Sequence, residues 1–565
     1  MKRVRKNAIR DEANGWPVRS GTADMAFFNG TIYTADGVQS RCEALAIAAG
    51  RIVYTGTYKG LKPWIGPHTE LIDLKGRTAL PGFHDAHVHP VIGALDLTEC
   101  LLTGLKTSEE VLSEVRRWAK EHGALQFIRG SGWKHQLFGL RGPHKTLLDR
   151  IVPDRPVFLR AIDGHSAWVN STALRMAGIT RETSNPPGGR IERDPNTGDP
   201  SGILREWPAM RLVEERFEPS SVEALTNGLK RFMKMAARAG VTSVHDAMVR
   251  RDCLEAYAAL ERQNALTVRV KASLLLEPRY GPEAVSELKA LREEYHRPLL
   301  HADGVKLFID GVVESRTAFL VDPYVDGMGF TGEPLWNRDE FNRAIVALDR
   351  EGFQVHAHAI GDGAVRMALD GFEYASRVNG IGDGRHQIAH LDLVSKEDIS
   401  RFRSLGIIAN FQPAWFFEEE SLPDLYMELL GRERVSRLYP MEDIFRTGGL
   451  ITCGSDWPAG DEMISLNPLD AIRNGLLGLA GKRTGTESFP PQKSIGLREM
   501  IDFYTRTAAY ASFQESEIGT LEAGKLADVI VLDCNLFELL KENINKARVV
   551  LTLIGGETVF RDALL

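Results

Sequence analysis

Short apolar runs separated by turn residues dominate the first 80 residues. Residues 23–80 contain the runs AFFNGTIYT, ALAIAAGRIVYTG and ELIDLKGRTALPG. This spacing is typical of short antiparallel strands, with turns expected at Asn29-Gly30 and Ala49-Gly50. The same pattern returns near the C-terminus in LADVIVLD, VVLTLIGG and ETVF. Two β-rich ends around a different middle predict one small β-domain, residues 1–80 plus 515–565, that closes around an inserted larger domain.

A regular alternation of helix and strand begins near Val222. Amphipathic ALTNGLKRFMKMAARAG precedes VTSVHDA, AVSELKALREEY precedes GVKLFIDG, and FNRAIVALDREG precedes FQVHAHAIGD. Further strand-like runs are HQIAHLD, GIIANFQP and GLITCGSDWP. Alternating helices and strands predict an α/β fold with a parallel sheet, and this many units favour a (β/α)₈ TIM barrel within residues 81–514. An open doubly wound sheet is the alternative.

The alternation is less regular within residues 95–217. GGRIERD and SGILREW flank the turn-forming segment PNTGDP, which predicts a hairpin with a long turn. We interpret part of this region as an insertion near the barrel mouth. Its hairpin could be a substrate lid or a peripheral hairpin without a catalytic role.

Composition and charge narrow the classes of function. The 565 residues carry a net charge of -7, which argues against a nucleic-acid-binding surface. Five scattered cysteines without a CxxC pair make a poor disulfide framework and favour a reducing compartment. The basic start is followed by Asp11 and Glu12 instead of an apolar stretch, and no run is long enough for a membrane span. The sequence therefore predicts a soluble, cytoplasmic protein with neither a nucleic-acid nor a membrane partner.

Histidines and one aspartate mark the ends of several predicted strands. His87 and His89 in LPGFHDAHVHP lie two residues apart, so on a strand both project to one face and can reach one metal ion. Taken alone, such a pair is equally well explained by core or solvated histidines. His358, His390 and Asp456 each follow a predicted barrel strand, at the edge where barrel active sites are built. Together the five residues predict a metal site.

Lys306 stands inside the apolar strand GVKLFIDG, where an ammonium loses hydration. An ammonium cannot bind a cation, whereas a lysine carbamylated by carbon dioxide is an anionic oxygen donor that can bridge two metal ions. The alternative is a structural ion pair with Asp310 or Glu314.

These motifs resemble the amidohydrolase superfamily of metal-dependent hydrolases. Within it, the chain is similar to amidohydrolase family 3, the branch of N-substituted formamide deformylases. The likeness runs from FNGTIYTAD through LPGFHDAHVHP, DGHSAWVNS, GVKLFIDG, HAHAIGD, IAHLD and GSDWP to GTLEAGKLADVIVLD. It implies a (β/α)₈ barrel carrying a small β-sandwich built from both termini.

The resemblance also implies the roles of the site residues. The implied ligands of one or two divalent ions, most commonly zinc, are His87, His89, Lys306 as a carbamylated bridge, His358, His390 and Asp456. His356 shares a strand face with His358 one layer deeper, so we expect it to support a ligand or to lie in the core. Metal-activated hydroxide would attack the scissile carbonyl, and Asp456 would move the proton to the leaving amine.

Substrate contacts are expected from two motifs. DGHSAWVNS contains His165 and Trp168, which we assign to the substrate pocket, although this segment could also be a loop capped by Asn170 or Ser171. Trp457 and the run WFF at 415–417 follow strand ends and could line an apolar pocket or pack the barrel.

The predicted function is hydrolysis of a non-peptide carbon–nitrogen bond in a small molecule, an N-substituted amide or formamide. The enzymatic alternative is a cyclic amide, lactone or carbamate at the same site. A non-catalytic binding or regulatory barrel protein is the alternative of another class. A homo-oligomer is expected only from the general frequency of symmetric soluble enzymes.

Overall fold

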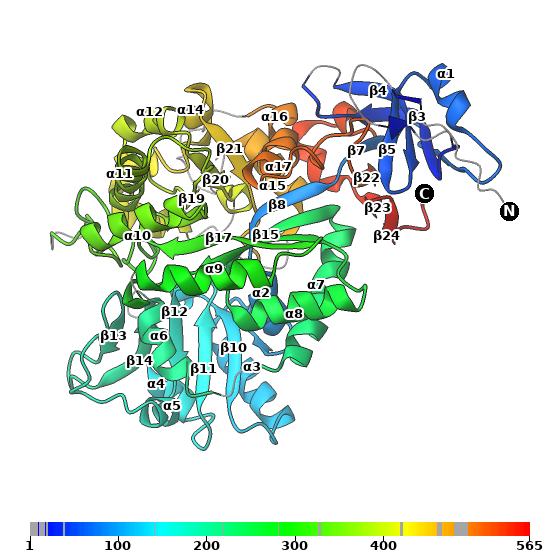
Figure 1. Cartoon of the computed structure of the whole chain (residues 1–565). Helices are drawn as coiled ribbons and strands as arrows, with labels where there is room; N and C mark the ends of the chain where they lie inside the picture. Colours follow the sequence, from blue (N-terminus) through cyan, green and yellow to red (C-terminus); the bar gives the residue numbers. More distant parts are fainter. Residues whose placement is uncertain are drawn as a thin grey trace.

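Eight parallel strands form the central sheet of the computed structural model (Figure 1). The structure describes residues 9–10, 17–18, 21–37, 40–139, 142–217, 220–280, 282–325, 329–417, 422–459, 466–478 and 495–565. The order of the central strands is β21-β20-β19-β18-β17-β16-β15-β8. Their bounds are β8 (Phe83–Val88), β15 (Val241–Val249), β16 (Arg269–Leu275), β17 (Leu300–Phe308), β18 (Gln354–Ala359), β19 (Gln387–His390), β20 (Ile408–Phe411) and β21 (Leu450–Cys453).

Backbone hydrogen bonds connect β8 and the residue after it to the segment that follows β21. The Asp456 amide donates to the His87 carbonyl at 2.7 Å, and the His89 amide donates to the Trp457 carbonyl at 2.8 Å. The sheet is therefore nearly closed, and the predicted (β/α)₈ barrel is confirmed.

Amphipathic helices cover the barrel. In α7, Leu225, Leu229 and Phe232 recur at helical spacing and are buried, and the Ser221 side chain caps its first turn. The helices are α2 (Pro90–Asp96), α7 (Val222–Arg238), α8 (Arg251–Arg262), α9 (Val285–Glu294), α10 (Arg338–Arg350), α11 (Asp362–Asn379), α12 (Lys396–Leu405), α13 (Leu422–Val435), α14 (Met441–Arg446), α15 (Pro468–Leu477), α16 (Leu497–Phe503) and α17 (Arg506–Ala511). No helix in the described part of the chain is long and apolar enough to cross a membrane.

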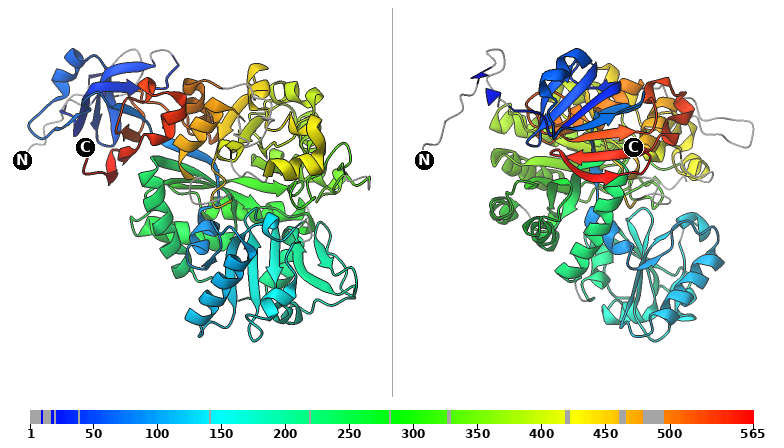
Figure 2. Two further views of the ribbon diagram at one scale, coloured as in Figure 1. Left: turned by 180° about the vertical axis from the view of Figure 1, so that it is seen from behind. Right: turned by 90° about the vertical axis from the view of Figure 1, so that its right-hand side faces the viewer.

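A second sheet joins the two ends of the chain. Its order is β24-β23-β22-β7-β3-β4-β5, and β6 pairs with β3. The N-terminal strands lie beside the C-terminal strands in both views of Figure 2. The strands are β3 (Met25–Tyr33), β4 (Arg41–Ala48), β5 (Arg51–Gly56), β6 (Glu70–Asp73), β7 (Thr78–Pro81), β22 (Val529–Leu532), β23 (Val549–Ile554) and β24 (Glu557–Arg561), with helix α1 (Tyr58–Leu61) after β5. This arrangement confirms a small β-domain made from both termini.

One predicted turn in this sheet is correct and one is wrong. Ala49 and Gly50 have φ values of 49° and 78° and form the turn between β4 and β5. Asn29 also has a positive φ of 59°, but it lies inside β3, where the pairing with β4 shifts register between Phe28 and Ile32. The positive φ is accommodated by an irregularity within a continuous strand, so no hairpin forms there.

The region after β8 builds a third sheet, which we call the insert sheet. Its order is β13-β14-β12-β11-β10-β9, and β13 and β14 form the predicted antiparallel hairpin. Its elements are β9 (Cys100–Leu101), α3 (Ser108–Glu121), β10 (Ile128–Trp133), α4 (Lys145–Asp149), β11 (Val157–Ala161), β12 (Ser166–Val169), α5 (Ser171–Met176), β13 (Arg190–Arg193), β14 (Pro200–Arg205) and α6 (Glu206–Glu214). In Figure 1 the insert sheet lies below the barrel, on the side away from the composite β-domain. The exact domain boundaries stay predictions.

Candidate active site

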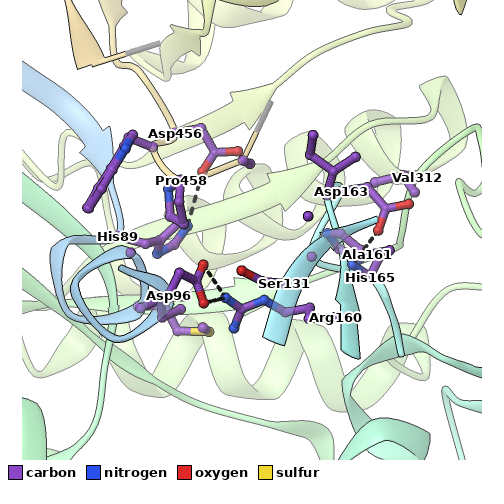
Figure 3. Close-up of a pocket in the computed structure, with 18 of the residues that line it drawn as sticks. His89, Asp96, Ser131, Arg160, Ala161, Asp163, His165, Val312, Asp456 and Pro458 are labelled. Carbon is purple, nitrogen blue, oxygen red and sulfur yellow. Dashed lines mark hydrogen bonds and ion pairs between the residues drawn. The ribbon is translucent and has the colours of Figure 1, made fainter. Parts of the chain in front are cut away.

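A cavity lies between the carboxyl-terminal ends of the barrel strands and the insert sheet (Figure 3). Residues 160–165 of the insert form one wall, and side chains that follow barrel strands form the other. Its lining includes the predicted site residues His89, His165, Lys306, His358, His390, Asp456 and Trp457. The insert therefore forms part of the pocket wall, through the segment 160–165.

Two histidines and an aspartate converge at the base of this region. The potential ligand atoms of His87, His390 and Asp456 all lie within 4.8 Å of one another, and all three residues are buried. Asp456 Oδ1 is 3.3 Å from His87 Nε2 and 3.1 Å from His89 Nε2, and Asp456 Oδ2 is 4.0 Å from His390 Nδ1. The Asp456 carboxylate is thus the common neighbour of three predicted ligands.

Short polar links hold these strand ends in place. The Asp85 side chain accepts the amide N–H of His87 at 3.2 Å and that of Ser455 at 2.9 Å, so it ties β8 to the segment after β21. Asp456 has a φ of 57°, a left-handed conformation that aspartate tolerates better than most residues. The local backbone therefore turns the carboxylate toward the histidines.

The two histidines of β18 differ in their surroundings. His356 Nε2 is 2.9 Å from His87 Nδ1, so it orients a predicted ligand from behind. The His358 ring contacts the His390 ring at a tilt of 60°, with centroids 4.4 Å apart, but its Nε2 lies 3.2 Å from the Gly311 carbonyl oxygen. His358 is therefore next to the three-residue cluster without belonging to it.

Lys306 is fully buried on β17. Its Nζ has no hydrogen-bond partner among the described residues and lies 4.7 Å from the centroid of the Phe308 ring. Burial lowers the pKa of Lys306 to about 7, against the opposing effect of Asp456. The alternative ion pairs are not formed, because Asp310 accepts backbone amides and Glu314 accepts the Tyr426 hydroxyl.

Several buried polar atoms at this site have no hydrogen-bond partner among the described residues. His87 Nε2, His390 Nδ1 and Lys306 Nζ make no hydrogen bond within the described part of the chain, although buried polar atoms are normally bonded. Burial lowers the pKa of both histidines, which favours the neutral imidazole that binds metals. Two imidazoles and a carboxylate are a ligand set typical of a zinc-type ion, so these residues fit one.

The comparisons with known proteins agree with this geometry. The sequence pattern of the amidohydrolase family matches residues 70–560, which include all of these side chains. This chain belongs to the amidohydrolase family. The protein LONG AFTER FAR-RED 3 of Arabidopsis thaliana is 31% identical over 549 residues, which cover 95% of this chain and 92% of that protein.

Two further proteins similar to this amidohydrolase are hydrolases by name. The N-substituted formamide deformylase of Arthrobacter pascens is 26% identical over 552 residues, 94% of this chain and 97% of that enzyme. An uncharacterized metal-dependent hydrolase from Pyrococcus horikoshii OT3 has a crystal structure with a TM-score of 0.70 and 26% identity, covering 92% of this chain and 99% of that chain. The amidohydrolase is thus a metal-dependent hydrolase by family and by fold.

His165 lines the cavity and is held by two acidic residues. Its Nδ1 is 2.8 Å from Glu206 Oε2, and its backbone amide donates to Asp163 Oδ1 at 2.8 Å. Burial opposes a charge on this imidazole, but the Glu206 carboxylate outweighs it and raises the pKa of His165 to about 9. Its ring centroid is 4.9 Å from that of His358, so the predicted substrate-facing position of His165 is next to the metal-ligand candidates.

The predicted tryptophans separate into cavity and core. Trp457 and Trp415 line the cavity. Trp168 is fully buried and packs against Trp133 and Phe138 inside the insert sheet, so its predicted contact with substrate is not supported by its position. Residues alternate faces along β12: Trp168 belongs to an apolar cluster with residues of α3 and α4, whereas Ala167 and Val169 belong to a second cluster of the insert. Asn170 caps α5, as the alternative for this segment proposed.

Sequence reasoning missed two polar pairs of this amidohydrolase. Arg160 Nη2 lies 2.5 and 2.6 Å from the two Asp96 carboxylate oxygens at the cavity wall (Figure 3). Arg160 interrupts the apolar strand VFLRA, the same signal that pointed to Lys306. Glu206 had no comparable local signal, because its partner His165 lies 41 residues earlier.

Proposed function

We propose that this amidohydrolase cleaves a carbon–nitrogen bond other than a peptide bond, in an N-substituted amide or formamide. The observation that carries the proposal is the buried cluster of His87, His390 and Asp456 beside a largely apolar cavity. The apolar lining, which includes Trp415 and Trp457, suits the substituent on the nitrogen. Similarity to an N-substituted formamide deformylase supports the same reaction class.

The residues proposed to hold a divalent ion, zinc in the first instance, are His87, His390 and Asp456, joined by His89, His358 and a carbamylated Lys306 if two ions bind. The ion would supply hydroxide at neutral pH and polarise the scissile carbonyl. The lowered pKa of Lys306 keeps part of its amine neutral near pH 7, and the neutral amine is the form that reacts with carbon dioxide.

Asp456 is proposed to carry the proton. Burial alone would raise the pKa of this carboxyl, but the hydrogen bond and charge of the neighbouring histidines lower it, so the carboxylate is ionised at neutral pH. It can therefore accept a proton from the attacking water and donate it to the leaving nitrogen, which is too basic to leave unprotonated.

Metal content and a substrate panel test the proposal. Protein purified without chelator should contain one or two equivalents of a divalent metal per chain by elemental mass spectrometry. Less than about a tenth of an equivalent would instead favour a non-catalytic binding barrel. On the panel, open-chain N-substituted amides should turn over faster than lactams, lactones and carbamates, and faster turnover of lactones would refute the substrate class.

We also propose that the protein acts in the cytoplasm on a small molecule, without nucleic acid or membrane as partner. All five cysteines are free, which suits a reducing compartment.

A further inference from the structure

The Arg160–Asp96 ion pair occupies the junction between two cavities. The catalytic cavity and a second, neighbouring cavity share five lining residues: Ile92, Asp96, Arg160, Trp207 and Met248. The second cavity continues between the insert sheet and helices α2, α6 and α8. A substrate that reaches beyond the first cavity would therefore pass this ion pair.

Arg160 has side-chain N–H donors without an acceptor in the described part of the chain. Only its Nη2 is hydrogen-bonded, to both Asp96 oxygens, and its Nε and Nη1 have no hydrogen-bond partner among the described residues. Its side chain is 15% exposed and that of Asp96 is 9% exposed. A largely buried ion pair is weak evidence for a stabilising role, because the cost of removing both charges from water offsets their attraction. Free N–H groups at a cavity wall indicate a binding role instead.

The charges around Arg160 restrict what it can bind. Asp96, Glu214 and Glu99 all act on this guanidinium. Glu99 and Glu214 also line the second cavity. In all, four arginines (Arg129, Arg160, Arg211 and Arg250) and five carboxyl groups (Asp96, Glu99, Glu214, Glu215 and Asp252) of the described residues line the second cavity, so it offers no excess positive charge for an anion. A neutral oxygen acceptor, such as a carbonyl, ether or hydroxyl oxygen, can accept the free N–H groups without meeting repulsion from the carboxylates.

We propose that Arg160 is a specificity residue that binds a neutral oxygen of the substrate where its N-substituent passes from the first cavity into the second. This inference rests on the proposed amide hydrolase function. Asp96 fixes the guanidinium by its two contacts with Nη2 and leaves the other donors directed away from itself. The favoured substrates thus carry an uncharged oxygen in an extended N-substituent.

A matched substrate series tests this assignment. N-alkyl formamides of equal length would be compared with an ether oxygen, a methylene or a carboxylate at the same place in the chain. Arg160→Met should lower kcat/KM for the ether substrate by about 10- to 100-fold, the usual value of a hydrogen bond to a charged donor, and for the methylene substrate by less than about 3-fold. Equal losses for both substrates, or a wild-type preference for the carboxylate, would overturn the proposal.

Two further variants separate binding from folding. Arg160→Met leaves Asp96 buried without its partner, so the double variant Arg160→Met/Asp96→Asn, which removes both charges, should show the same loss for the ether substrate. Arg181→Met, which breaks an exposed ion pair with Asp199 on the same insert, should behave as wild type. An ether preference retained in the double variant would reject the role of Arg160.

A binding measurement keeps the test independent of turnover. The product amines, with and without the ether oxygen, would be titrated into metal-depleted protein by calorimetry. Wild type should bind the ether amine more tightly by about 10-fold, and Arg160→Met should not discriminate. If no amide is hydrolysed but this discrimination is found, the proposed function fails and the subsite stands. If amides are hydrolysed without discrimination, the subsite fails alone.

Discussion

Lys306→Met should stabilise the metal-free protein, although it removes a residue of the proposed site. The Lys306 amine is buried without a hydrogen-bond partner in the described structure, and methionine keeps a similar length and volume. The pKa of Lys306 falls from 10.5 to about 7 on folding. At pH 7 that difference lowers the free energy of unfolding of the wild type by about 4 kcal/mol.

The pH dependence gives this prediction a sign. Between pH 7 and 10.5 the unfolded lysine binds more protons than the folded one, so the stability of the wild type rises with pH. The advantage of Lys306→Met should therefore shrink to about 1 kcal/mol at pH 10. For a chain of 565 residues, about 4 kcal/mol corresponds to a rise of about 3 °C in Tm at pH 7.

Calorimetric melting of chelator-treated protein in buffer free of carbon dioxide would measure both effects. Lys271→Met is the matched control, because Lys271 is equally buried on the neighbouring strand but its Nζ is 2.8 Å from Asp303 Oδ1. That variant should lower Tm, since it breaks an ion pair. The reasoning would be refuted if Lys306→Met melted at or below the wild-type temperature, or if its advantage did not shrink at higher pH.

Three further outcomes are expected. Asp456→Asn should keep its metal by elemental mass spectrometry but lower kcat by about 10²- to 10⁴-fold, the usual contribution of a proton-transfer group, and near-normal turnover would contradict the proton-carrying role. Lys306→Ala should lose metal and regain part of its activity with short carboxylic acids, an expectation that full metal content in the variant would rule out. Trp168→Phe should lower the free energy of unfolding by about 1–2 kcal/mol, because the loss of packing volume outweighs the gain from removing a buried N–H that has no partner among the described residues. The KM of this variant should equal that of the wild type. A raised KM at unchanged Tm would show that Trp168 contacts the substrate.

The barrel could be predicted because its strands are buried on both faces. Every residue of β15 and β18 is buried, so the histidines within these strands stand out against their apolar neighbours. The convergence of His87, His390 and Asp456 followed from one rule, that parallel strands end at the same edge of a barrel.

Features set by long-range packing escaped prediction. The face of β12 on which Trp168 lies depends on how the helices of the insert pack, and both faces of that strand are covered by apolar clusters of the insert. The pair of His165 with Glu206 joins two segments whose proximity depends on the antiparallel pairing of β12 with β14. The pair Asn29-Gly30 correctly indicated a positive φ at Asn29, but the same backbone conformation occurs in strand irregularities as well as in turns. The pair therefore did not distinguish the two.

The composite β-domain has a consequence for synthesis on the ribosome. Strand β7 pairs with β22, and about 450 residues separate the two strands in the sequence. At typical rates of 5–20 residues per second, the pairing edge of β7 stays without its partner for about 20 to 90 s after β7 is made. An unpaired strand edge is a template for pairing with other chains. The nascent protein therefore needs protection of this edge, by a chaperone or by low local concentration, until its last strands have emerged.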